Sequence, residues 1–430
     1  MTATSSKVMD VAPSARPRSA EVETRQAHDG ACGISQWSGD IGVFNASDVS
    51  VYVHFPWCLK KCPYCDFNSH GTSRDDIPQA AYTDAVRREL AWRLPSVAHR
   101  RLVSIFFGGG TPSLWDPKGI ASVIQDIRGA FASQVDDVEI TAECNPTSLD
   151  GARTAALREA GINRVSIGVQ SLDDARLKYL GRLHDSQGAL TALREATAEM
   201  DRVSGDLMFG MPGQKPADFL DEVARVLDTG VKHVSAYALT IEPGTQFGEL
   251  HRKGRLPIAT DDDYAETFLA AEALLGSRGF GHYEVSNYAQ AGEEARHNIH
   301  YWRGGAYLGV GAGAVGMSEA GCAEGHAKRW RSRSLPKAYM EQSGSIEVEE
   351  WSEALDPEAR VREALMLGLR SREGVSRALV KARTGLDVLA GRSPAVTRRT
   401  ERGELLVDDD TLRIPHAKWL ALDGIVADLF

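Results

Sequence analysis

The sequence predicts an α/β fold in which six consecutive βα units build a mostly parallel sheet. From Val51 onward, short runs rich in β-branched and aromatic residues alternate with longer stretches of helical period. Polar residues and glycines end one strand after another, where the functional residues of such sheets lie. The chain of 430 residues is 43% hydrophobic and 25% charged, which is typical of a globular protein.

The predicted strands and helices follow one another in strict alternation. The strands are residues 51–55, 102–107, 138–143, 164–170, 202–209 and 233–239, and the helices are residues 79–93, 117–131, 151–160, 173–179, 186–200 and 216–229. Right-handed units of this number form either an open doubly wound sheet or a partial barrel. In both folds the carboxyl ends of the strands share one edge, so their polar residues should converge on one pocket.

Two further regions are expected after the βα units. A helix is predicted over 261–277, and the Gly-, Tyr- and His-rich stretch that follows, to about residue 316, is expected to cover the barrel mouth. Helices at 358–371 and 375–384, strands at 404–407 and 411–415 and a helix at 419–429 predict a winged-helix-like α+β module. We therefore divide the chain into a disordered tail (1–50), a barrel (51–245), a covering region (246–350) and a C-terminal module (351–430).

Charge and composition exclude several classes of protein. The 49 Lys and Arg are outnumbered by 59 Asp and Glu, and this net charge of −10 argues against a protein that binds nucleic acid through its phosphates. No stretch approaches the roughly 20 apolar residues of a membrane span, and the N-terminus lacks the apolar core of a secretory signal. We therefore expect a cytoplasmic protein with reduced cysteines.

Three of the six cysteines lie within eight residues, in the pattern Cys58-x3-Cys62-x2-Cys65 directly after the first strand. Thiolates this close in sequence can converge on one metal centre. A tetrahedral zinc ion would need a fourth ligand, for which His54 or His70 is available. An iron–sulfur cluster held by only three cysteines instead leaves one iron open for reaction.

The segment Cys58-Leu-Lys-Lys-Cys62-Pro-Tyr-Cys65 resembles the CxxxCxxC signature of radical S-adenosylmethionine (radical SAM) proteins. The six βα units also match the partial barrel of that family. The resemblance implies a [4Fe-4S] cluster on the three cysteines. It also implies that the open iron binds the amino and carboxylate groups of S-adenosylmethionine, whose sulfonium the cluster can cleave by giving it an electron.

A second set of residues resembles the family's pocket for S-adenosylmethionine. The glycines at 108–110 are similar to the segment that binds the methionyl amino group, although a tight turn explains them equally well on local sequence. A solvated strand end likewise explains any one of the polar residues taken alone. By resemblance to the coproporphyrinogen dehydrogenase branch, the pocket is lined by Tyr52, Tyr64, Gly109, Gly110, Thr111, Glu143, Gln170, Arg182 and Asp206.

The segment His297-Asn-Ile-His-Tyr301 is similar to the HNxxY motif of the bacterial haem chaperones (HemW type). These chaperones form a branch of the oxygen-independent coproporphyrinogen III dehydrogenase (HemN-like) family, and the motif is implicated there in haem binding. A satisfied core histidine is the commoner explanation for such a residue taken alone. The dehydrogenases carry a further cysteine two residues after the third, where this chain has Phe67. Val315 stands where these proteins commonly have a histidine, which puts the mode of haem binding in question.

The resemblance therefore implies a haem chaperone that binds a [4Fe-4S] cluster, S-adenosylmethionine and haem and passes haem to client haem proteins. One alternative is an oxygen-independent coproporphyrinogen III dehydrogenase, which would be an enzyme. A zinc-binding interaction protein is the non-redox alternative. Basic clusters at 329–333 and 398–402 would suit haem propionates or a peripheral membrane contact, although such charge runs usually form solvated faces.

Overall fold

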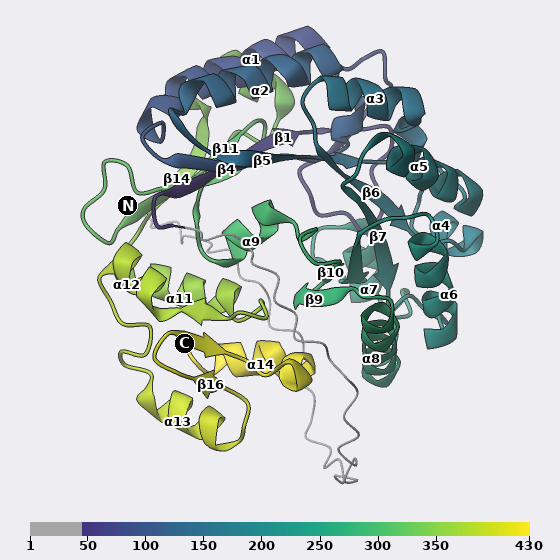
Figure 1. The fold of residues 1–430 in the computed structure, drawn as a ribbon. Coiled ribbons are helices and arrows are strands. Elements are labelled where there is room, and N and C mark those ends of the chain that lie inside the picture. Colours follow the sequence, from purple (N-terminus) through teal and green to yellow (C-terminus); the bar gives the residue numbers. More distant parts are fainter. Residues whose placement is uncertain (1–44) are drawn as a thin grey trace. The chain divides into compact units, whose positions relative to one another are not determined.

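A sheet of 12 strands forms the centre of the computed structural model, which describes residues 45–430 (Figure 1). Its six middle strands are parallel, and they form the predicted partial barrel. They are β1 (Asp48–Phe55), β4 (Arg101–Gly109), β5 (Ser133–Cys144), β6 (Arg164–Gln170), β7 (Val203–Phe209) and β8 (His233–Ala238). The helices between them are α1 (Gln79–Arg93), α2 (Pro117–Ala130), α3 (Gly151–Glu159), α4 (Asp174–Tyr179), α5 (Ser186–Glu199) and α6 (Pro216–Leu227). Every strand and helix predicted for this series is present.

Residues 281–355 extend both edges of this sheet, whereas the sequence suggested a cover over the barrel mouth. Beyond β8 lie the antiparallel strands β10 (Asn287–Ala289) and β9 (Gly281–Glu284). On the other edge β11 (Ala306–Val310) pairs in parallel with β1, and β12 (Val315–Ser318), β13 (Ala327–Ser332) and β14 (Glu349–Leu355) follow as antiparallel strands. These strands satisfy backbone groups that an edge would leave unpaired. The sheet therefore crosses the boundary predicted at residue 245.

Four helices accompany the added strands. They are α7 (Gln246–Arg252), α8 (Asp261–Ser277), α9 (Arg296–Trp302) and α10 (Pro336–Gln342). α8 has the bounds predicted for it. Across residues 45–430, no helix combines the length and the apolar character needed to cross a bilayer. The predicted tail lies outside the described residues as far as residue 44.

The middle strands have one apolar face and one polar face. On β1, Val51, Val53 and Phe55 belong to the apolar core, which the outer helices α1, α2, α3, α5 and α6 complete (Figure 1). Ser50 and Tyr52 alternate with them and face the other way, because successive side chains of a strand point to opposite sides. The second face therefore carries buried polar groups, and these groups surround the site described below.

The C-terminal module has a core of its own. Its elements are α11 (Pro357–Gly368), β15 (Val375–Ser376), α12 (Arg377–Thr384), α13 (Ser393–Glu401), β16 (Leu406–Val407), β17 (Thr411–Arg413), the 3₁₀ helix η5 (His416–Ala421) and α14 (Leu422–Ala427). The strands form an antiparallel sheet in the order β15-β17-β16, as a winged-helix-like module requires. α13 was not predicted, because none of its residues is fully buried and only Ala395 and Val396 pack against the module's core, which leaves a weak apolar pattern. The helix predicted at 419–429 begins as η5.

A buried carboxylate joins α1 to the added strands. Glu89 is fully buried, and its Oε1 accepts from Arg93 Nε at 2.8 Å and from the Ser332 hydroxyl at 2.7 Å. Its Oε2 accepts from the Gly311 backbone N–H at 2.9 Å and from the Tyr339 hydroxyl at 2.8 Å. One side chain thus satisfies donors from α1, α10, β13 and the turn after β11.

Replacing Glu89 by Ala should lower the free energy of unfolding by about 3 kcal/mol, because buried donors lose their shared acceptor. Chemical denaturation followed by circular dichroism would measure the loss. Arg87→Ala is the control on the same helix, since its ion pair with Asp126 is exposed and should contribute less than about 1 kcal/mol. Equal losses in the two variants would contradict this account of the α1 contact.

Candidate functional site

The three clustered cysteines lie in the loop that follows β1. Cys58 ends the short strand β2 (Trp57–Cys58), which pairs with β3 (His70–Gly71), and the loop between these strands carries Cys62 and Cys65. All three are free thiols with partly exposed side chains. Burial raises the pKa of the Cys58 and Cys65 thiols, so a bound metal is what would hold them as thiolates.

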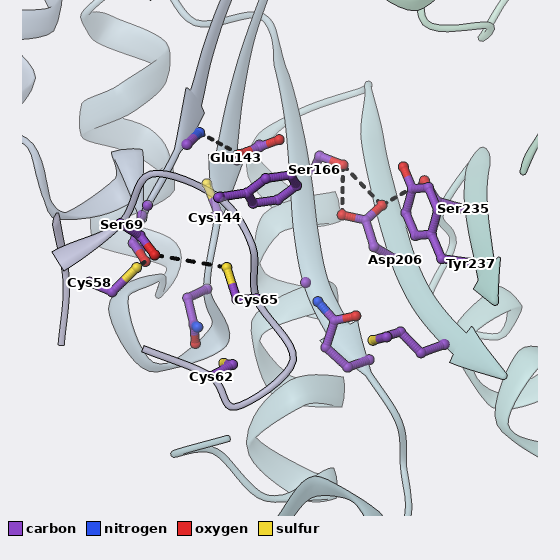
Figure 2. Close-up of a pocket in the computed structure, with 18 of the residues that line it drawn as sticks. Cys58, Cys62, Cys65, Ser69, Glu143, Cys144, Ser166, Asp206, Ser235 and Tyr237 are labelled. Carbon is purple, nitrogen blue, oxygen red and sulfur yellow. Dashed lines mark hydrogen bonds between the residues drawn. The ribbon is translucent and has the colours of Figure 1, made fainter. Parts of the chain in front are cut away.

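Two side chains from loops beside the cavity donate hydrogen bonds to these sulfurs. The Thr111 hydroxyl donates to Cys58 Sγ at 3.4 Å, and Arg182 Nη1 donates to Cys62 Sγ at 3.7 Å. Figure 2 shows the three sulfurs around the mouth of one cavity. Donors of this kind stabilise negative charge on sulfur, as an anionic cluster requires.

The distances between the possible ligand atoms distinguish a site for an iron–sulfur cluster from a site for a single zinc ion. One zinc ion with Zn–S bonds of about 2.3 Å would hold its sulfurs about 3.8 Å apart. At this loop, no three described Cys, His or carboxylate ligands have donor atoms that all lie within 4.8 Å of one another. The loop therefore fits a centre of several metal atoms better than a single ion.

His54 joins the cysteine loop to β1 through a hydrogen bond. Its Nε2 donates to the Asn68 carbonyl at 2.8 Å, and its Nδ1 then accepts from the Tyr52 hydroxyl at 2.9 Å. Asn68 is anchored in turn by donating to the Ala312 carbonyl at 2.9 Å. Both nitrogens of His54 are thus engaged, which removes it as the fourth zinc ligand considered from the sequence. Tyr52 lies behind the loop and not in the cavity.

A cavity of about 450 Å³ opens beside this loop, at the carboxyl ends of the middle strands (Figure 2). Pockets of about 300–1,000 Å³ hold one small ligand, and S-adenosylmethionine is of that size. The sequence-predicted residues that line it are Cys58, Cys62, Tyr64, Cys65, Gly109, Gly110, Thr111, Glu143, Gln170, Arg182 and Asp206. The strand ends converge as the parallel topology requires.

Gly109 and Gly110, at the end of β4, have no room for a side chain. Gly109 has a φ of 111°, and a Cβ there would lie 2.5 Å from the His54 ring. A Cβ on Gly110 would lie 2.6 Å from the Trp57 carbonyl oxygen. The tight turn considered from the sequence is thus correct, and the same turn brings backbone to the cavity wall.

Two carboxylates point into the cavity from β5 and β7 (Figure 2). Burial raises the pKa of Glu143 to about 7, against the effect of a 3.0 Å hydrogen bond from the Gly109 N–H. Burial also raises the pKa of Asp206. Asp206 accepts from the hydroxyls of Ser166 at 2.8 Å and Ser235 at 2.8 Å. These carboxylates are therefore preorganised acceptors in a site shielded from water.

Arg182 reaches from the end of α4 to the cysteine loop. Its Nη2 donates to the Gly168 carbonyl at 2.7 Å, while its buried Nε has no hydrogen-bond partner among the described residues. An arginine with an unused N–H at a cavity is suited to a carboxylate of a ligand. Nearby Gln170 has a φ of 66°, a conformation that is rare outside glycine and common at binding sites.

The HNxxY segment forms α9, and the structure does not bring its two predicted residues into the cavity. The His297 ring stacks on Phe106 at 4.9 Å, and its Nδ1 lies 2.9 Å from the Ser104 hydroxyl. Burial lowers the pKa of His297 to about 3. Tyr301 packs against Tyr307 at 5.4 Å with 37% of its surface exposed.

Several cavity residues were not predicted as site residues. They are on the polar faces of the middle strands and on α9: Thr141, Arg164, Ser166, His233, Ser235 and Asn298. Arg164 is 2% exposed and donates to the Glu293 carbonyl at 3.0 Å. The available signal was the alternation of small polar or charged residues with valine and isoleucine along each strand.

Comparison with known families finds a match for the barrel and another for the C-terminal module. Residues 52–226 match the model of the radical SAM superfamily, and residues 355–417 match that of the HemN C-terminal domain. The heme chaperone HemW of Haemophilus influenzae is 39% identical over 68% of this chain and 76% of its own. The mitochondrial radical S-adenosyl methionine domain-containing protein 1 of Bos taurus is 37% identical over 88% and 87%, respectively.

The chain belongs to the HemW branch of the radical SAM superfamily. Its fold is similar to that of the Escherichia coli coproporphyrinogen III oxidase HemN, with a TM-score of 0.71 and 20% identity over 89% of this chain and 90% of that one. Radical SAM proteins use a [4Fe-4S] cluster and S-adenosylmethionine. The donor-lined cysteine loop and the cavity beside it fit these two groups.

Cys58→Ala should remove the brown colour and the bound iron, since two thiolates do not hold a four-iron cluster in place of three. Iron and acid-labile sulfide analysis after anaerobic reconstitution would measure the loss. Cys322→Ala is the matched control, because Cys322 lies in a loop after β12 and does not line the cavity. Full iron content in the Cys58 variant would remove Cys58 from the cluster.

Proposed function

We propose that the protein is a haem chaperone that binds haem together with a [4Fe-4S] cluster and S-adenosylmethionine and transfers haem to client haem proteins. The observation that carries this proposal is the similarity to HemW chaperones, which reaches 36% identity over 79% of this chain for the Escherichia coli protein. Phe67 supports it, because the dehydrogenases of the family carry a cysteine at this position. Phe67 itself lies at the cavity that the radical SAM fold provides.

In this proposal the side chains around the cavity hold the two cofactors. Cys58, Cys62 and Cys65 bind the cluster, which when present supplies an open iron and an electron. Arg182 orients the carboxylate of S-adenosylmethionine through its free N–H. Glu143 and Asp206 accept hydrogen bonds from the ligand's hydroxyls and balance its sulfonium charge. Tyr64, Gly109, Gly110, Thr111 and Gln170 complete the wall, and Tyr52 acts through His54 on the loop.

Haem is assigned to the α9 region, at His297 and Tyr301. The cavity has room for one ligand of the size of S-adenosylmethionine, so haem binds outside it. His297 is 9% exposed and packed on Phe106. Ligation by its imidazole therefore requires this ring to leave its contacts, together with a shift of α9.

The dehydrogenase alternative has less support. Phe67 is 59% exposed at the rim of the cavity and supplies no thiol. The likeness to HemN, at 20% identity, concerns the fold alone. Protoporphyrinogen formation with S-adenosylmethionine and a reductant would restore this alternative.

The proposal places the protein in the cytoplasm. Peripheral membrane contact stays a prediction, and the basic clusters give it little support because several of their arginines are ion-paired. Arg329 bonds Glu353 and Glu363, and Arg398 bonds Asp428 at 2.5 Å. Paired guanidinium groups attract an anionic surface less than free ones do.

Haem binding should be saturable with one haem per chain and should weaken about tenfold or more in His297→Ala, because a lost axial ligand removes well over 1.4 kcal/mol. An anaerobic haemin titration followed at the Soret band would measure both affinities. His99→Ala is the control, since His99 is an exposed histidine. Absence of specific binding to the wild type would contradict the chaperone function, whereas equal affinities would move haem away from α9.

Glu143→Gln should weaken S-adenosylmethionine binding about tenfold at pH 8 and much less at pH 6. The pKa of Glu143 is about 7, so its carboxyl group is mostly neutral at pH 6 and ionised at pH 8, where it attracts the sulfonium. Equilibrium dialysis at both pH values would give the ratio of the two dissociation constants. A ratio that does not change with pH would exclude ionised Glu143 from the ligand site.

A further inference from the structure

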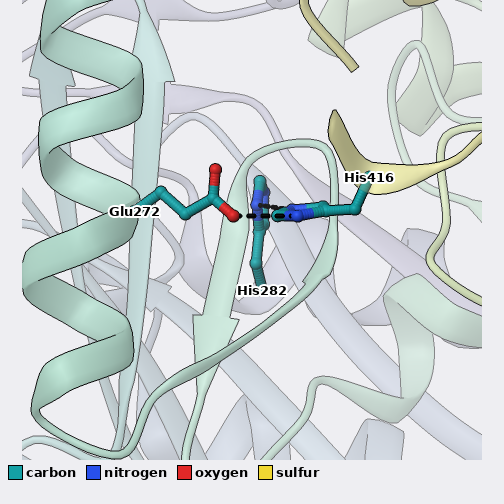
Figure 3. A group of neighbouring side chains, drawn as sticks. All are labelled: Glu272, His282 and His416. Carbon is teal, nitrogen blue, oxygen red and sulfur yellow. Dashed lines mark hydrogen bonds and ion pairs between the residues drawn. The ribbon is translucent and has the colours of Figure 1, made fainter. Parts of the chain in front are cut away.

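A second group of metal-type ligands lies outside the cavity, where the C-terminal module meets α8 and β9. Glu272 comes from α8, His282 from β9 and His416 from η5 (Figure 3). Each offers one ligand atom, and these atoms all lie within 4.8 Å of one another. Three segments far apart in the sequence thus bring two imidazoles and a carboxylate together.

The contacts within this group, here called the Glu-His-His cluster, are short. His282 Nδ1 lies 2.9 Å from His416 Nε2, and His416 Nδ1 lies 2.8 Å from Glu272 Oε1. His282 is 4% exposed, whereas the side chains of His416 and Glu272 are 29% and 27% exposed. The cluster is therefore closed on its inner side and open to exchange with solvent on its outer side.

Aromatic rings hold both imidazoles in place. The His282 ring stacks on Tyr288 at 4.0 Å, and the Trp419 ring meets His282 at 4.6 Å and His416 at 4.7 Å. Phe268 adds a contact with His282 at 5.7 Å. Rings packed in this way have few other orientations, so the ligand atoms are preorganised.

Hydrogen bonds alone leave the cluster incomplete. Glu272 in its ionised form can only accept, so His416 donates from Nδ1 and keeps a lone pair on Nε2. His282 must then donate from Nδ1, which leaves its buried Nε2 as an acceptor with no partner among the described residues.

The imidazoles are also in the form that binds metal. Burial lowers the pKa of His282 to about 3 and that of His416 to about 4, and the positive charge of Arg372 acts in the same direction on both. Both rings are thus neutral near pH 7, with a lone pair available. With His282 Nδ1 on a metal, the ring's proton would move to Nε2, as in other metal-bound histidines.

We propose that Glu272, His282 and His416 form a site for a divalent transition-metal ion, with Zn²⁺ as the ion best suited to two imidazoles and a carboxylate. Sites with this donor set bind zinc in other folds and keep a fourth position for water. The ion fastens the C-terminal module to α8 and β9, because only His416 comes from the module. The site is independent of the cysteine loop and of haem.

The experiment is zinc binding to the full chain after reconstitution of its cluster. We expect His282→Ala and His416→Ala to bind about one zinc fewer per chain than the wild type after dialysis, and Glu272→Gln to bind it about tenfold more weakly. His251→Ala, an exposed histidine on α7, should match the wild type. All variants keep the cysteine loop, so the difference between them isolates this cluster. Equal zinc content in all of them would overturn the proposal.

Two further measurements cover a variant that fails to fold. Zinc should raise the unfolding temperature of the wild type more than that of Glu272→Gln, which keeps the shape of the side chain. Co²⁺ in place of zinc should give d–d absorption without the charge-transfer band of a cobalt–thiolate bond. A thiolate band, or an equal rise in unfolding temperature for both chains, would assign the metal elsewhere.

Discussion

The buried polar face of the parallel sheet is the constraint on which the rest of the structure depends. Alternate residues of every middle strand lie on it, and buried polar groups must find partners there. Ser104 donates to Ser50 at 2.8 Å, and the carboxylate of Glu139 accepts the backbone N–H groups of Arg296 and His297 at 3.1 Å and 3.0 Å. Glu139 thus satisfies the first turn of α9 and holds this helix against the sheet, where a carboxylate is also favoured by the helix dipole.

The same network links α9 to the cavity. Asp206 accepts from Ser204 at 3.2 Å, Ser204 lies 2.6 Å from His233 Nδ1, and His233 Nε2 lies 2.8 Å from the Tyr283 hydroxyl. That hydroxyl accepts from the Ala295 N–H at 3.2 Å, directly before α9 begins. A ligand that bonds to Asp206 therefore acts on a set of hydrogen bonds that also fixes the start of the helix with the HNxxY segment.

The sequence was sufficient for the barrel and for most of the cavity, because parallel βα units place all carboxyl ends at one edge. Glu143 and Asp206 were named through the family resemblance, and both line the cavity. The position of β11 beside β1 could not be found, since it depends on pairing between residues about 250 positions apart. The role of Tyr52 depends on one hydrogen bond to His54. His297 packs on Phe106 of β4 and Tyr301 on Tyr307 of β11, so their contacts depend on which strand each end of α9 meets. Local patterns carry none of this information.

The position of His297 also bears on how haem would be released. In the proposed function, its imidazole gives up the contact with Ser104 and the stacking on Phe106 when it binds haem. Each of these contacts contributes on the order of 1 kcal/mol, so the exchange lowers the net affinity for haem. When haem leaves, the neutral ring returns to partners that the fold keeps ready. A chaperone has to give up its haem, and a ligand that is satisfied both with and without haem lowers the free-energy difference between the two states.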